Sequence, residues 1–106
     1  MGIDLLMFEQ GGVKAIEQKR GNTFCHLLNQ VTGIDLCEGL DEGSVIVDNA
    51  KLRKVNDALN AFTRASMAWK LETRGGWTIG EAMTFVANYA TWIETHAEAD
   101  HYMVVG

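Results

Sequence analysis

The sequence predicts one α+β domain, in which two long antiparallel helices and shorter helices pack on a small sheet. Apolar side chains recur every three or four residues through residues 52–69 and again through residues 79–97. This is the period of a helix with one face on a core. Three short apolar segments are candidate strands, at residues 3–8, 44–47 and 101–105. The alternative is an all-α domain in which those segments are tails and loops.

Length and composition favour a single globular domain over residues 1–106. Hydrophobic residues make up 47% of the chain and charged residues 22%. These shares are average for a globular protein, and a chain of this length can fold without disulfides or a structural metal. No apolar run approaches the roughly 18 residues that span a membrane, and residues 1–8 lack the basic region of a signal peptide. Cys25 and Cys37 fit a reducing compartment, where a single disulfide is not needed. We therefore expect a cytoplasmic protein without a membrane partner.

The first half of the chain alternates short elements with glycine breaks. Residues 3–8 are the first predicted strand. Residues 13–19 are interpreted as a short helix that ends at Gly21. Residues 22–31 form the next predicted helix, which begins with a polar cap and has one apolar face. Gly33 ends this helix, and residues 38–43 form an acidic, glycine-containing loop.

The second half contains the two long helices. Asp48 or Asn49 is a suitable N-cap for the first helix, which is predicted to run to about Glu72. Glycine at position 75 is suited to the left-handed residue after its end. Thr78 and Glu81 then fit a capping box that begins the second helix. Because the link is short, we expect the two helices to lie antiparallel or steeply crossed.

Charge is distributed unevenly along the chain. The net charge is −5, yet residues 51–74 carry six bases and two acids, and residues 75–106 carry four acids and no base. The acidic balance disfavours nucleic-acid binding, because the phosphate charge would be repelled by most of the surface. A local basic patch on the first long helix is an alternative anion-binding site, and neutralisation by the 38–43 loop would also explain the bases at the start of that helix. Its residues are Lys51, Arg53, Lys54 and Arg64.

The second long helix has more apolar surface than one interface requires. One stripe is the expected core face, and a second, aromatic stripe runs beside it. Both stripes can be core. Alternatively, the aromatic stripe contacts another protein or a second copy of this chain, because such surfaces favour aromatic residues. The predicted partner-binding residues are Trp77, Phe85, Tyr89 and Trp92.

No motif predicts catalysis, a cofactor or a metal. Cys25 and His26 are adjacent on a predicted helix, where neighbouring side chains point about 100° apart and do not form a working pair. The cysteines and histidines lack zinc-ligand spacing, and the glycines match no phosphate-binding pattern. We therefore expect a protein that is not an enzyme. A small enzyme with an unidentified site is a further alternative.

Residues 1–8 have the form Met-small-x-Asp-hydrophobic, and residues 79–105 combine an alanine-rich helix with a short terminal strand. In these two ends the chain resembles a group of small tailed-phage and prophage proteins. The resemblance implies a phage or prophage accessory protein, a group whose role is mostly unassigned, and it transfers no site residue. The favoured hypothesis is an accessory protein that binds another protein. The runner-up is a nucleotide- or nucleic-acid-directed protein that uses the basic patch.

Overall fold

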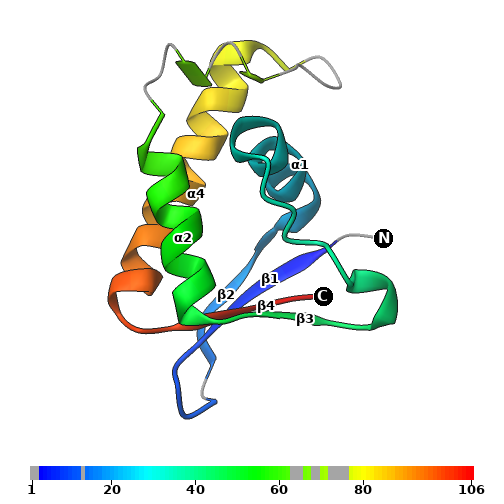
Figure 1. Cartoon of the computed structure of the whole chain (residues 1–106), viewed down its shortest axis with the longest axis vertical. Coiled ribbons are helices and arrows are strands. Elements are labelled where there is room, and N and C mark those ends of the chain that lie inside the picture. The colour runs from blue at the N-terminus through cyan, green and yellow to red at the C-terminus, as the bar shows by residue number, and fades with distance from the viewer. Residues whose placement is uncertain (1–2, 13, 63–65, 68–69, 72–76) are drawn as a thin grey trace.

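The predicted α+β class is confirmed. The structure, a computed structural model, places its helices over one face of a four-stranded antiparallel sheet (Figure 1). All three predicted strands form. The structure describes residues 3–12, 14–62, 66–67, 70–71 and 77–106.

The sheet has the strand order β2-β1-β4-β3. β1 (Asp4–Phe8) and β4 (Tyr102–Val105) lie side by side at its centre, so the two ends of the chain pair with each other. Asp4 and Gly106 extend this pairing, because each backbone N–H donates to the other's carbonyl, at 2.7 and 3.0 Å. β3 (Val45–Val47) pairs with the outer side of β4.

The predicted helix at residues 13–19 is wrong, because this segment is the edge strand β2 (Lys14–Arg20). A tight turn precedes it, in which Gly12 has a left-handed φ of 87° and its N–H donates to the carbonyl of Glu9. The turn returns the chain antiparallel to β1. A helix this short is marginal without tertiary support, so backbone pairing with β1 decides the structure. The lysines and arginine in its sequence suit an edge strand.

The helix α1 (Gly21–Thr32) confirms the prediction for residues 22–31. Gly33 follows it with a φ of 77°. Gly21, expected to end the preceding element, is instead the first residue of α1. Phe24, Leu28 and Val31 from this helix are buried.

The first long helix is shorter than predicted. α2 (Asn49–Asn60) begins at the expected cap, where the Asp48 carboxylate accepts from the Lys51 N–H at 2.8 Å, but it does not continue to Glu72. The chain leaves the helix and is helical again at residues 66, 67 and 70. Met67 and Leu71 are buried in the same core. Met67 and Leu71 reach the core although α2 ends at Asn60, so the apolar period could not reveal where the helix ends. The predicted cap at Gly75 lies outside the described residues.

The second long helix has the predicted start. α4 (Ile79–Glu98) begins with a complete capping box. It runs antiparallel to α2 and packs beside it (Figure 1). Asp100, with a φ of 62°, turns the chain from α4 into β4.

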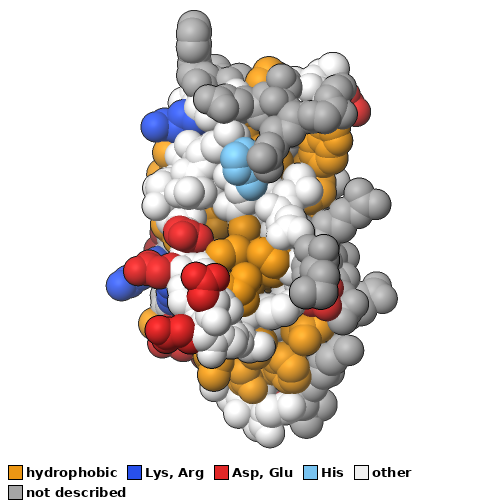
Figure 2. Space-filling model, turned by 90° about the vertical axis from the view of Figure 1, so that its right-hand side faces the viewer, with side chains coloured by type: hydrophobic (Ala, Val, Ile, Leu, Met, Phe, Trp, Pro, Cys, Tyr) orange, Lys and Arg blue, Asp and Glu red, His pale blue; other side chains and the backbone are white. Residues whose placement is uncertain are grey.

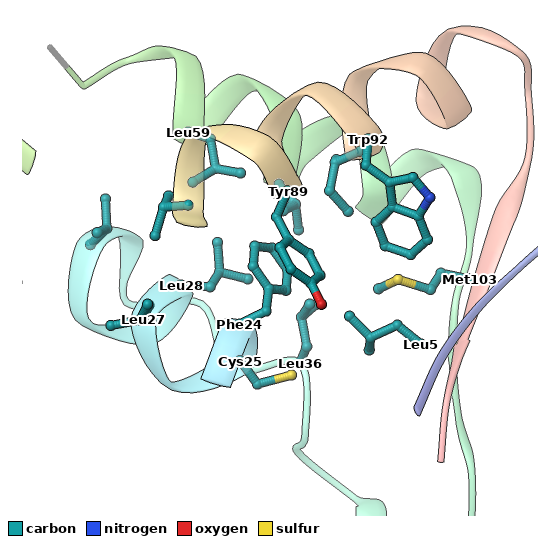
Figure 3. Packing of buried hydrophobic residues seen from close by; sticks show 14 of the residues in the cluster. Leu5, Phe24, Cys25, Leu27, Leu28, Leu36, Leu59, Tyr89, Trp92 and Met103 are labelled. Carbon is teal, nitrogen blue, oxygen red and sulfur yellow. The ribbon is translucent and has the colours of Figure 1, made fainter. Parts of the chain in front are cut away.

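The core lies between the helices and the inner face of the sheet (Figure 3). Leu5, Met7 and Met103 point inward from the two central strands and are fully buried. The alternate residues face the other side of the sheet, where Ile46 is 68% exposed. Figure 2 shows hydrophobic side chains in the lower part of the molecule, where Figure 1 places the sheet.

Gly21 lies where β2 passes into α1, at a position without room for a side chain. We predict that Gly21→Ala destabilises the fold by about 1–3 kcal/mol, the usual cost of overpacking. A Cβ atom at Gly21 would lie 2.5 Å from the backbone oxygen of Ile3. The Gly21 N–H donates to that same oxygen, so the backbone cannot move aside cheaply. Urea denaturation of the variant measures the loss.

The matched control is Gly80→Ala on α4. Its added Cβ would meet only the Thr78 hydroxyl, at 3.8 Å. Alanine is the better helix former by about 1 kcal/mol, so this variant should be as stable as the wild type or more stable. Equal stability of the two variants would contradict the assignment of Gly21 to a close backbone approach.

Candidate functional site

The structure divides the predicted aromatic stripe into a buried half and an accessible half. Tyr89 and Trp92 are only 7% and 9% exposed and belong to the core. The ring of Tyr89 stacks on that of Phe24 from α1, with centroids 4.4 Å apart, as Figure 3 shows. These two members of the predicted contact surface therefore pack α4 against the rest of the fold.

Trp77 and Phe85 form the accessible half. Both are half-buried, and their rings meet edge to face with centroids 5.2 Å apart. Together they line an open groove of about 640 Å³ along the first turns of α4. The remaining lining residues are polar or small: Thr78, Gly80, Glu81, Thr84 and Asn88. We call this feature the Trp77–Phe85 groove.

The local sequence fixes the groove. The Thr78 hydroxyl accepts from the Glu81 N–H at 3.1 Å, and the Glu81 carboxylate accepts from the Thr78 N–H at 3.0 Å. This capping box sets the entry of the chain into α4 and thereby the position of Trp77. At the other end, the Phe85 ring lies against Tyr89, with centroids 4.8 Å apart. The aromatic surface of the groove is thus continuous with the core.

The rim of the groove carries hydrogen-bonding groups, and some of them are already paired within α4. The Thr84 hydroxyl donates to the Gly80 carbonyl at 3.0 Å. Asn88 and Glu81 are exposed. An apolar centre with a polar rim is found at protein–protein contact surfaces and at small-molecule sites.

The basic patch is only partly defined. Lys51, Arg53 and Lys54 lie on the first turns of α2, and Arg64 lies outside the described residues. Arg53 has a partner within its own helix, because its Nε donates to the Asn49 side-chain oxygen at 2.7 Å. The same Asn49 amide donates to the carbonyls of Ala97 and His101. Arg53 therefore supports a structural contact.

A pair of histidines, which the sequence placed on different elements, meets where α4 turns into β4. The Nδ1 atoms of His96 and His101 lie 2.7 Å apart. This hydrogen bond requires one nitrogen to donate and the other to accept, so it cannot exist when both rings are protonated. Burial, and next the neighbouring His101, lower the pKa of His96 from its ordinary 6.5. The left-handed turn at Asp100 brings the two rings together, which spacing alone did not reveal.

One further feature was not predicted: the indole Nε1 of Trp92 is buried and has no hydrogen-bond partner among the described residues. A buried unpaired donor costs about 1–3 kcal/mol.

Within the described residues, no group of three His, Cys, Asp or Glu side chains is placed to hold a metal ion. None of the described helices combines the length and the apolar character needed to cross a membrane.

Comparisons with known proteins found no matching family model, no matching curated protein and no matching solved structure.

The histidine pair predicts a pH dependence of stability. The pKa of His96 is lower in the folded protein than in the unfolded chain. Between these two values the unfolded chain binds more protons, so the free energy of unfolding falls as the pH falls from above about 6.5 through the folded pKa. Urea titrations at several pH values measure this loss.

His96→Gln is the control, because glutamine removes the titration and retains a hydrogen-bonding amide. The variant should lose the part of the slope that lies just below pH 6.5, while slopes due to carboxylates at lower pH remain. Identical slopes for wild type and variant in that window would contradict the prediction.

Proposed function

We propose that this chain is a small accessory protein of the phage type that acts by binding another protein and not by catalysis. The observation that carries the proposal is the Trp77–Phe85 groove, which leaves two contacting aromatic rings partly accessible beside a polar rim. The phage-type assignment rests on the resemblance of the chain ends, which form β1, α4 and β4. The free cysteines fit a reducing compartment such as the cytoplasm.

Preorganisation makes the groove suitable for binding. The capping box fixes Trp77, and Tyr89 supports Phe85 from the core. A partner therefore need not order these rings, which removes part of the entropic cost of association. Aromatic residues in well-packed positions are also those whose truncation most weakens protein interfaces.

The size and charge of the groove indicate the kind of partner. Its volume of about 640 Å³ holds a few side chains of a protein segment. Residues 75–106 carry four acids and no base, so a neutral or basic segment with an apolar anchor would meet no like charge. A second copy of this chain is the alternative partner, and its sequence supplies both apolar and basic segments.

Phe85→Ala is predicted to weaken partner binding by about 2 kcal/mol or more, the usual loss at a central aromatic contact. Phe85 is only half-buried, so the variant should still unfold cooperatively. Capture of partners on immobilised protein, followed by calorimetric titration of the captured protein, measures the effect. Light scattering over a concentration range tests self-association in the same variant.

Ile46→Thr is the matched control, because it removes an apolar side chain from the exposed sheet face, away from the groove. It should leave binding unchanged. Trp92→Ala is unsuitable, since truncating a core aromatic costs about 3–5 kcal/mol of stability. The proposal that the groove binds the partner is overturned if Phe85→Ala leaves binding unchanged and the Lys51→Ala/Lys54→Ala double variant abolishes it. Together with a steep dependence of binding on salt, that result favours the anionic-ligand alternative.

A further inference from the structure

The face of the sheet that points away from the helices is apolar across three strands. Side chains alternate between the two faces of a strand, and one set of residues in β1, β3 and β4 is buried in the core. The alternate residues point outward: Leu6 and Phe8 from β1, Tyr102 and Val104 from β4, and Ile46 from β3. Ile46 is 68% exposed, and the other four are half-buried. We call these five residues the outer sheet face.

The outer sheet face is a contiguous patch. Leu6, Val104 and Ile46 stand directly opposite one another across the three strands. Beside this row the rings of Phe8 and Tyr102 stack, with centroids 5.5 Å apart and planes inclined by 16°. None of the described helices covers the patch, because they pack on the opposite side of the sheet (Figure 1). The solvent face of an antiparallel sheet is normally polar, so an apolar patch here marks a contact surface.

The two edges of the sheet differ in charge. The sequence of the edge strand β2 contains three bases and one acid. At the other edge, β3 follows the acidic segment 38–43, in which Asp41 and Glu42 are exposed. The outer sheet face therefore lies between a basic strand and an acidic segment.

These opposite charges lie at the same end of the sheet. Lys19 of β2 is in register with Leu5 of β1. Leu5 is in turn in register with Val105 of β4, which pairs with Val45 of β3. Lys19 and Val45 thus belong to the same row, at opposite edges. Because Arg20 follows Lys19 and the acidic segment precedes Val45, both charged groups lie at the end where β1 begins.

We propose that the outer sheet face binds a second copy of this chain, in a symmetric dimer whose two sheets pack face to face. This inference does not depend on the Trp77–Phe85 groove, which lies on α4. A two-fold axis between the layers and parallel to the strands places β2 of each copy over β3 of the other. The basic edge of each copy then meets the acidic edge of the other at the same end. An axis across the strands would place β2 over β2, which charge repulsion opposes.

The same arrangement covers the apolar centre of both sheets. The axis passes between β1 and β4, so the strand that carries Leu6 and Phe8 lies over the strand that carries Val104 and Tyr102 in the other copy. Packed sheets keep their strand directions within about 30° of each other, which preserves this correspondence. The patch is therefore complementary to itself in shape of layer, in polarity and in edge charge.

The area of the sheet indicates the strength of the dimer. Four strands spaced about 4.8 Å apart and about five residues long present a face of about 300 Å². A stable complex buries about 800 Å² on each partner. We therefore expect a reversible dimer whose population depends on concentration, and to which the charged edges add contacts beyond the apolar centre.

The first test is light scattering of the full chain over a concentration range. The wild type should rise from the monomer mass towards twice that mass. Ile46→Lys should weaken association about tenfold or more, because it places a charge in the apolar centre and opposite the basic strand β2. Ile46→Val, which retains an apolar branched side chain, is the matched control and should associate like the wild type. Phe85→Ala in the groove should also leave association unchanged.

The second test exchanges the charges of the two edges. Asp41→Lys/Glu42→Lys makes both edges basic, and Lys19→Glu/Arg20→Glu makes both edges acidic. Each double variant alone should associate more weakly than the wild type, because like charges then face each other. An equimolar mixture should recover association as mixed dimers, in which both edge contacts join opposite charges. Native mass spectrometry distinguishes the mixed dimer by its mass.

Three results overturn the proposal. The first is a wild type that remains monomeric up to about 1 mM, including the case in which Ile46→Lys releases a different captured protein from this face. The second is a dimer that persists in Ile46→Lys or is lost in Phe85→Ala, which would assign self-association to another surface. The third is a mixture of folded charge variants that associates no better than either alone. If a charge variant does not unfold cooperatively, the comparison of Ile46→Lys with Ile46→Val decides.

Discussion

The pairing of the two chain ends at the centre of the sheet is the contact on which the rest of the structure depends. β1 and β4 are the first and last strands, and they hold together the hairpin partner β2 on one side and β3 on the other. The bonds between Asp4 and Gly106 extend the ladder beyond the strands. The sheet is therefore complete only when the last residues reach the first. Contacts so distant in the sequence must overcome a large loop-closure entropy.

This constraint fixes the C-terminal end of α4. The helix passes directly into β4 through the turn at Asp100, and Asn49 from α2 donates to carbonyls on both sides of that turn. The bond between His96 and His101 closes the same corner. Three elements, α2, α4 and β4, are thus held at one point. Protonation of both histidines removes one of the bonds at that point, which couples this corner to pH.

The opposite end of α4 has a different character. A helix of 20 residues is about 30 Å long, so its first turns lie far from the fixed corner. The aromatic residues change role along this length: Trp92 and Tyr89 fill the core, while Phe85 and Trp77 border the groove. Each ring touches the next, with centroid distances from 4.8 to 5.8 Å. The groove is therefore supported by the same packing that holds the fold, and a partner would meet a rigid surface.

Features that depend on a few neighbouring residues could be predicted from the sequence alone. Two of these features are local hydrogen bonds to backbone N–H groups, in the Thr78–Glu81 capping box and at the Asp48 cap. The third is the left-handed backbone conformation of Gly33 after α1. The three predicted strands also formed. The pairing of β2 with β1 and the end of α2 depend on contacts with other elements, and His96 and His101 meet only because the turn at Asp100 joins α4 to β4. The aromatic stripe shows the reason most clearly. Its period identified one face of a helix, but which of its rings are covered depends on where α1 and the sheet lie, and no local pattern contains that information.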